Sequence, residues 1–163
     1  MASRNSETLD TDLLIVGGGM TGLTTARAMA GVGLTSVVVD REAPAETLAV
    51  AADGRASALA AGSVRLMRDI GVWQSMADKA QPILEIRVSD GDAPFFLHYD
   101  HKDVGEEPLG HVVENRVTRA ALHDAVTGTP EVTHLAPAEV ASLERGTSGV
   151  AARLTDGRDV RTC

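Results

Sequence analysis

Three glycines near the N-terminus have the spacing of a phosphate-binding turn. They are Gly17, Gly19 and Gly22, in the pattern G-x-G-x-x-G. The apolar run Leu13–Val16 leads directly into them, and a helical pattern follows. Gly17 would let the chain turn sharply out of a strand. Gly19 would leave room for a pyrophosphate, and Gly22 would let the helix pack closely on the strand. A strand, a glycine turn and a helix in this order are what a dinucleotide-binding fingerprint requires.

An acid stands where this fingerprint places the ribose ligand. Asp40 ends the apolar run that begins at Ser36, about 20 residues after the glycines. Its carboxylate could accept hydrogen bonds from ribose hydroxyls and would disfavour a 2′-phosphate. Met20 and Thr21 are further candidates for cofactor binding, because they lie where the turn meets the helix, whose N-terminal N–H groups favour phosphate. A glycine-rich turn in some other α/β protein is the alternative, and it leaves the position of Asp40 unexplained.

The composition excludes several classes of function. The 163 residues are 44% hydrophobic but only 2% aromatic, so Leu, Val and Ala must form the core. A net charge of −8 argues against nucleic acid and does not favour electrostatic docking on anionic lipid. Because Cys163 is the single cysteine, redox chemistry must come from a bound cofactor. The sequence predicts neither a catalytic acid–base pair nor a metal site. His98 and His101 are three residues apart, which would suit two metal ligands on one face of a helix, but their segment is predicted as the end of a strand and a loop.

The N-terminus and the hydropathy favour a cytoplasmic protein. Residues 1–10 are polar without the apolar centre of a signal peptide, and we expect them to be disordered. No stretch approaches the roughly 20 apolar residues of a membrane span.

The elements that would hold the glycines and Asp40 form a βαβ unit. The pattern predicts a strand at Leu13–Val16, a helix at Thr21–Ala30 and a strand at Ser36–Val39, followed by a loop from Arg41 to Arg55. Later segments are predicted as helices at 56–70, 72–80 and 115–126 and as strands at 83–90, 95–99, 109–113, 131–135, 139–144, 150–155 and 158–162. Asp90–Gly91–Asp92 and Asp156–Gly157 predict hairpin turns. The fold class is therefore α/β, with a Rossmann-like domain around a parallel sheet and added strands from a second region.

Several further segments recur in order in one known family. The most specific are Asp53–Leu59 (D-G-R-A-S-A-L) and Gly110–Asn115 (G-H-V-V-E-N). With Gly71–Trp73 and Val88–Asp90, they resemble the ubiquinone-biosynthesis hydroxylases (the UbiH/UbiF/Coq6 family). These are FAD-dependent aromatic monooxygenases related to para-hydroxybenzoate hydroxylase. The resemblance implies an FAD-binding domain from residue 11 to 163, with 82–114 at the start of the substrate-side sheet.

The resemblance assigns roles to individual residues. Gly17, Gly19 and Gly22 would bind the FAD pyrophosphate. Asp40 would hold the adenosine ribose, with Arg41 beside it; most of the family has a glutamate at the position of Asp40. Arg55, with Ala56 after it, would lie along the flavin side of FAD, and Arg119 would contact FAD from a helix. A guanidinium presents paired donors that suit phosphate oxygens.

The resemblance also implies an activity. NAD(P)H would reduce the flavin, O₂ would give a C4a-hydroperoxide, and an oxygen atom would pass to a polyprenyl phenol. Such a substrate implies peripheral association of the full enzyme with the inner membrane, or with a biosynthetic complex. The family's later Gly-Asp flavin motif would lie beyond Cys163, so we expect a chain truncated at its C-terminus and inactive alone.

Two alternatives remain open: an NAD-dependent Rossmann oxidoreductase and a non-catalytic FAD-binding fragment. Ser57 lies in no nucleophile elbow, so a hydrolase has little support.

Overall fold

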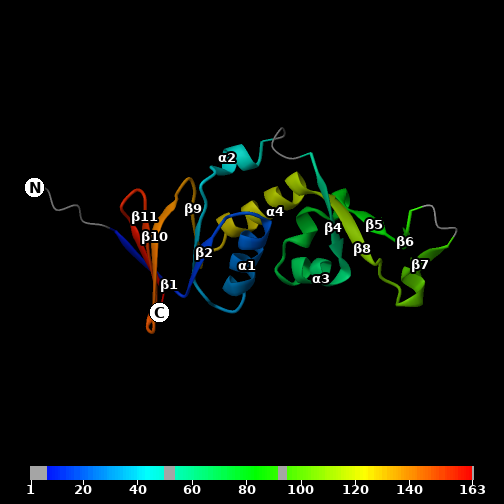
Figure 1. The fold of residues 1–163 in the computed structure, drawn as a ribbon, viewed down its shortest axis with the longest axis horizontal. Coiled ribbons are helices and arrows are strands. Elements are labelled where there is room, and N and C mark those ends of the chain that lie inside the picture. The colour runs from blue at the N-terminus through cyan, green and yellow to red at the C-terminus, as the bar shows by residue number, and fades with distance from the viewer. Residues whose placement is uncertain (1–6, 50–53, 92–94, 163) are drawn as a thin grey trace, which may run out of the picture. The chain divides into compact units, whose positions relative to one another are not determined.

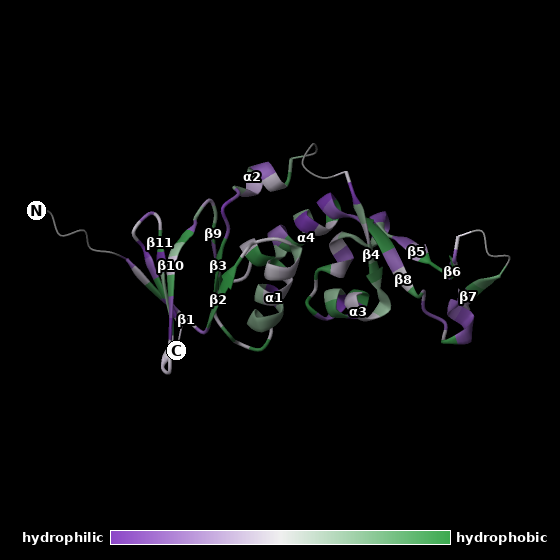
Figure 2. Ribbon diagram, in the orientation of Figure 1, coloured by the Kyte–Doolittle hydropathy of each residue, from purple (hydrophilic) through white to green (hydrophobic). Residues whose placement is uncertain are grey.

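Three short segments from distant parts of the sequence form a parallel sheet (Figure 1). The strands are β2 (Leu13–Val16), β3 (Ser36–Val39) and β9 (Val132–Leu135), in the order β2-β3-β9. All four residues of the middle strand β3 are buried, because both faces of a parallel strand are covered. Hydropathy colouring shows β2 and β3 mostly as hydrophobic (Figure 2). The predicted parallel βαβ unit is therefore confirmed.

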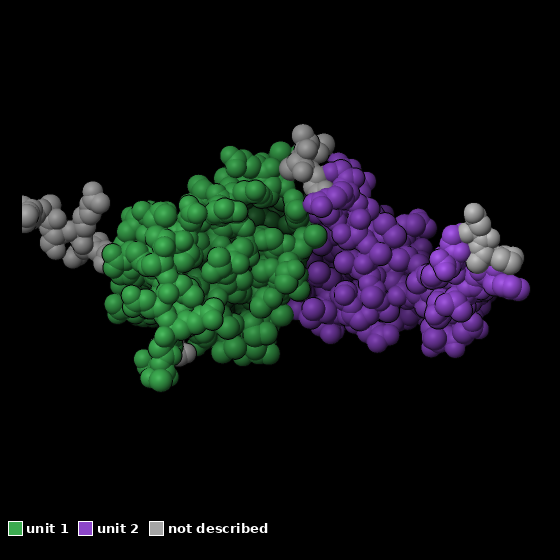
Figure 3. Space-filling model, in the orientation of Figure 1, with its two compact units in different colours: residues 1–52, 119–163 green, residues 53–118 purple. Residues whose placement is uncertain are grey.

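The computed structural model describes residues 7–49, 54–91 and 95–162. They divide into two compact units, which Figure 3 shows in different colours. Unit 1 comprises residues 1–52 and 119–163, and unit 2 comprises residues 53–118. Each unit is described by itself.

Helix α1 (Met20–Ala30) connects β2 and β3 and buries Leu23 and Ala26. It begins one residue before the predicted start. The helix ends at Ala30, and Gly33 in the turn that follows adopts a φ of +83°, a conformation that glycine tolerates best.

A four-stranded sheet completes unit 1. Its order is β1-β12-β11-β10, and the strands are β1 (Thr8–Thr11), β10 (Val140–Gly146), β11 (Gly149–Leu154) and β12 (Asp159–Thr162). The predicted hairpin between β11 and β12 is confirmed, with Gly157 at a φ of +94°. The expected disorder is wrong for Thr8–Asp10, because their backbone pairs with β12 from the other end of the sequence.

One apolar cluster joins this sheet to the parallel strands. It contains Val37 and Val39 of β3 together with Ala138, Ala152, Leu154 and Val160. Because side chains alternate along a strand, Val38 faces away from this cluster, toward the side that α1 covers. The core of unit 1 therefore lies on both faces of β3.

Unit 2 is built on an antiparallel sheet of order β4-β8-β5, formed by β4 (Ala56–Ala60), β5 (Gln81–Ile83) and β8 (Gly110–Glu114). Residues 56–70 were predicted as one helix, and this prediction is wrong for 56–60. That segment pairs with β8 over its whole length, so tertiary pairing overrides the helix propensity of its alanines. The helix itself, α3, spans Ala61–Asp69.

The chain after α3 is less regular than predicted. Two 3-10 helices, Trp73–Ser75 and Ala77–Lys79, replace the expected helix at 72–80. The expected strand at 83–90 is divided between two sheets. Ile83 is the last residue of β5 and pairs with Gly110 of β8, whereas β6 (Glu85–Ser89) pairs with β7 (Phe96–Asp100). A further 3-10 helix, His101–Asp103, follows β7.

The remaining predictions concern one loop, one turn and one helix. Within the predicted loop 41–55, a short helix α2 (Pro44–Thr47) begins with proline at its first position, which suits the fixed φ of proline. Residues 50–53 of that loop and residue 92 of the turn at 90–92 lie outside the described residues. Helix α4 (Asn115–Thr127) is confirmed, ending one residue later than predicted.

Candidate functional site

The turn between β2 and α1 requires glycine at two of the predicted positions. Gly17 has a φ of +107° and donates its N–H to the carbonyl oxygen of Val39 at 2.8 Å. A Cβ atom at Gly22 would lie 1.9 Å from the carbonyl oxygen of Gly17. The sharp turn at Gly17 and the close approach at Gly22 are therefore geometric facts of this fold. The assignment of both residues to a cofactor remains a prediction.

The start of α1 is open to an anion. Gly19 is the N-cap residue and offers no side-chain hydrogen bond to the helix. A Cβ atom at Gly19 would meet no described atom within 4 Å. The first N–H groups of a helix, here those of Met20 and Thr21, have no intrahelical partners, and the helix dipole gives them a partial positive charge. This arrangement suits a phosphate oxygen.

Asp40 links this turn to the segment after β3. Its Oδ2 atom accepts a hydrogen bond from the N–H of Gly18, and its Oδ1 atom accepts one from the N–H of Glu42 at 2.8 Å. Each carboxylate oxygen has a second lone pair, so both can still accept a hydroxyl. Asp40 can therefore hold the turn and bind a ribose at the same time.

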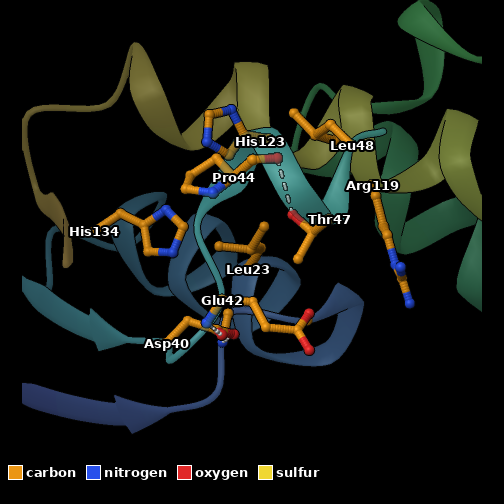
Figure 4. Close-up of a pocket in the computed structure, with 11 residues that line it drawn as sticks. Leu23, Asp40, Glu42, Pro44, Thr47, Leu48, Arg119, His123 and His134 are labelled. Atoms are coloured by element: carbon orange, nitrogen blue, oxygen red, sulfur yellow. Dashed lines mark hydrogen bonds between the residues drawn. The ribbon is translucent and has the colours of Figure 1, made fainter. Parts of the chain in front are cut away.

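A cavity with about 80 Å³ of space for solvent lies beside the turn. Figure 4 shows its lining residues, which come from the turn, α1, the segment after β3, α2, α4 and β9. They are Gly18, Gly19, Leu23, Asp40, Glu42, Pro44, Thr47, Leu48, Arg119, His123 and His134. Arg119, predicted from the sequence, thus lies in one cavity with Gly19 and Asp40.

A second hollow lies at the carboxyl ends of β2 and β3. It has about 510 Å³ of space and includes Gly17, Asp40 and Arg41 in its lining. Ligands of open α/β sheets bind in the crevice outside the carboxyl ends of the strands. Asp40 borders both spaces, so the turn and its acid lie together at the edge where a dinucleotide would bind.

Two histidines beside the turn escaped the sequence analysis. The rings of His123 on α4 and His134 on β9 lie edge to face with their centroids 5.8 Å apart. Burial lowers the pKa of His134, as does the neighbouring His123, whereas the charge of Asp40 acts in the opposite direction. His134 therefore favours its neutral form. Its position near the end of a parallel strand was the available indication, but β9 could not be assigned to this sheet from the sequence.

Gly18 was also missed. It is the unspecified position of the fingerprint, yet a Cβ atom there would lie 2.7 Å from Nε2 of His134 and 3.0 Å from Oδ2 of Asp40. Three consecutive glycines in the sequence indicated a constraint at this position, although its cause becomes visible only in the structure.

Arg55 and Ala56 belong to unit 2. The carbonyl oxygen of Arg55 accepts the N–H of Asn115 at 2.9 Å, and Ala56 is the first residue of β4. Ser57 next to them donates its hydroxyl to Oδ1 of Asn115 at 2.6 Å. These contacts fix the backbone around Arg55 within its own unit; its role toward FAD remains a prediction. Asp53 of the same motif lies outside the described residues.

His98 and His101 have local partners. His98 contacts Glu85 at 3.2 Å, and Nδ1 of His101 lies 3.1 Å from the carbonyl oxygen of Leu84. Within residues 7–49, 54–91 and 95–162, no group of three or more His, Cys, Asp or Glu side chains is arranged to hold a metal ion. None of the helices in this described part has the length and apolar character that a membrane crossing requires.

Comparison with known proteins identifies the family. The family described as the FAD binding domain matches residues 10–162, so the chain belongs to this family. Its α/β fold is the Rossmann-like FAD-binding fold. The solved structure of the flavin-dependent monooxygenase PieE, in complex with FAD and substrate, has a TM-score of 0.72 and 25% sequence identity, covering 94% of this chain and 29% of PieE.

Two curated relatives are hydroxylases. Ubiquinone hydroxylase UbiL of Rhodospirillum rubrum is 46% identical over 150 residues, which are 92% of this chain and 35% of that protein. The 3-demethoxyubiquinol 3-hydroxylase of Escherichia coli is 32% identical over 137 residues, which are 83% of this chain and 35% of that protein. The chain thus spans about a third of the length of these relatives.

Proposed function

We propose that this chain forms the FAD-binding portion of an aromatic-ring monooxygenase that hydroxylates a polyprenyl phenol in ubiquinone biosynthesis. One observation supports the proposal most strongly: the open turn at Gly19 lies at the start of α1 and is hydrogen-bonded through Gly18 to Asp40. The names of the two hydroxylase relatives support the reaction and the substrate class.

The residues of unit 1 fit the phosphates and the ribose of FAD. The N–H groups at the start of α1 would bind the pyrophosphate, and Arg119 in the adjoining cavity would add a guanidinium. Asp40 would accept the ribose hydroxyls. We assign Met20, Thr21 and Arg41 to the same half of the cofactor, and Arg55 with Ala56 to its flavin side.

FAD, when bound, would supply the redox chemistry, with NAD(P)H as reductant and O₂ as the source of the oxygen atom. The contribution of the protein would be binding, orientation and exclusion of water. Because the chain spans about a third of its relatives, we propose that it holds FAD but does not turn over alone. A peripheral membrane contact would belong to the longer enzyme.

The visible spectrum of the protein after incubation with FAD and desalting tests this proposal. We expect a retained flavin band in the wild type and its loss in Gly19→Val, whose new side chain would occupy the space for phosphate. Gly105→Val is the matched control, because a Cβ atom there also meets no described atom within 4 Å. Riboflavin, which lacks the pyrophosphate, should not be retained.

A folded, colourless wild-type protein would contradict the FAD proposal for this chain. If the same protein bound NADH instead, the dehydrogenase alternative would replace it. Peroxide production on addition of NADH would show that the chain turns over alone, contrary to our expectation.

A further inference from the structure

The imidazole of His134 lies directly beneath the phosphate-binding turn. The register Ile15–Val38–His134 places this residue on the strand beside β3. In Figure 4, His134 lies on the side of the cavity where Asp40 and His123 are found, with Arg119 on the other side. A Cβ atom at Gly18 would approach Nε2 of His134 to 2.7 Å, so the ring edge and the turn backbone are immediate neighbours.

The nitrogen that faces the turn has no hydrogen-bond partner among the described residues. Nε2 of His134 is buried and forms no hydrogen bond with any residue that the structure describes. Buried polar groups are nearly always hydrogen-bonded, and an exception calls for an explanation such as a missing ligand or a functional role. Since Asp40 and Gly18 lie beside this atom, protonation of the ring to the imidazolium form would introduce a positive charge next to the turn.

The charged and titratable groups that line the cavity with His134 come from two parts of unit 1. They are Asp40 and Glu42 after β3 and His123 and Arg119 on α4. Burial and His123 lower the pKa of His134, and Asp40 only partly offsets them. In the absence of ligand the imidazole is therefore neutral near pH 7, and an anion placed on the turn would favour its protonation.

We propose that His134 makes cofactor binding by this chain proton-linked: the imidazole takes up a proton when a dinucleotide pyrophosphate occupies the turn at Gly18 and Gly19. The proposal rests on the proposed binding of FAD at that turn. His134 acts through Asp40 and the turn and is a positioning residue.

The direction of the effect follows from linkage. A group whose pKa is higher in the complex than in the free protein binds protons on complex formation, so affinity rises as the pH falls. The affinity for FAD should increase as the pH decreases through the pKa of the complex. It should level off once His134 is protonated in the free protein too. Each unit of difference between the two pKa values corresponds to about a tenfold change in the dissociation constant.

Calorimetric titration with FAD between pH 8 and pH 6 tests the proposal. Measurements in two buffers of different ionisation enthalpy give the number of protons taken up on binding. We expect tighter binding at the lower pH and net proton uptake in the wild type. Both effects should be lost in His134→Gln, which keeps a donor and an acceptor but does not titrate in this range.

Two matched variants localise the effect. His98→Gln changes an exposed histidine of unit 2 that pairs with Glu85, and it should retain the full pH dependence. His123→Gln alters the neighbouring ring and should retain the sign of the dependence. If the dependence disappears in His123→Gln but persists in His134→Gln, the proposal is wrong.

A measurement without cofactor separates this inference from the proposed function. In ¹⁵N-labelled protein, the amide resonance of Gly18 should titrate with the same midpoint as the ring of His134. A midpoint shared with His123 alone, or no titration of Gly18, would overturn the inference even if FAD binds. If FAD does not bind but Gly18 follows His134, the proposed function fails and the coupling of the imidazole to the turn stands.

Discussion

The parallel strand β3 and the ribbon formed by β6 and β7 use similar residues in opposite ways. In β3, Val37, Val38 and Val39 are 3% exposed or less, because the second sheet covers one face and α1 the other. In the ribbon, Ile86 and Val88 lie opposite Tyr99 and Leu97, and these four side chains are 41–61% exposed.

The difference shows that apolar content alone does not determine burial. Apart from Phe96, the other face of the ribbon is polar, and Glu85 contacts both Arg87 and His98 there at 3.2 Å. A strand with one polar face needs other elements packed against its apolar face only, whereas the continuous apolar sequence of β3 requires packing on both faces. The core that stabilises the candidate site therefore lies around β3, and the ribbon contributes little to it.

Aspartate substitutions in β3 and in β6 should produce the largest difference in the free energy of unfolding. Val38→Asp would bury an unpaired carboxylate at a position that is 0% exposed. Such a change costs several kcal/mol, about the whole stability of many domains. Val88→Asp, at a position that is 51% exposed, should change the free energy of unfolding by about 0.5 kcal/mol. Circular dichroism during urea denaturation measures both. Equal losses would mean that the ribbon is covered in solution.

A glycine substitution in each unit should give the next largest effect. A Cβ atom in Gly22→Ala would overlap the carbonyl oxygen of Gly17 at 1.9 Å, so we expect loss of FAD retention together with a lower Tm. In Gly62→Ala of α3, the new atom meets no described atom within 4 Å, and replacing a helical glycine should stabilise by about 0.5–1 kcal/mol. Thermal unfolding and the flavin spectrum distinguish them. A Gly22→Ala protein that kept both its Tm and its flavin would refute the close approach.

The pH dependence of unit 2 should give the smallest effect. Burial lowers the pKa of His111, and the charge of Arg68 adds to this. The unfolded chain therefore binds more protons than the folded one as the pH falls below about 6.5, so stability should decrease on acidification and level off below the folded pKa.

The fluorescence of Trp73 should report the loss of stability on acidification. This residue is the single tryptophan of the chain, and its ring centroid lies 4.9 Å from that of His111. Urea unfolding followed by its fluorescence at pH 8 and pH 5.5 should show a smaller loss of stability in His111→Gln than in the wild type. His98→Gln is the control and should match the wild type. An identical loss in His111→Gln would remove His111 as the cause.

The sequence by itself determined the local part of the site. The spacing of Gly17, Gly19 and Gly22 and the acid after the second strand require only neighbouring residues and one βαβ unit. Such short-range patterns are encoded by periodicity and by backbone freedom at glycine. For the same reason the helix at Asn115–Thr127 and the hairpin near Gly157 were predicted closely.

The tertiary structure decided what depends on distant pairing. Thr8–Thr11 became a strand because β12 pairs with it, and residues 56–60 became a strand because β8 does. Neither partner can be recognised from local propensity, since the backbone hydrogen bonds that select the strand come from elsewhere in the chain. His134 joined the site in the same way: only the pairing of β9 with β3 places its imidazole beside Gly18 and Asp40.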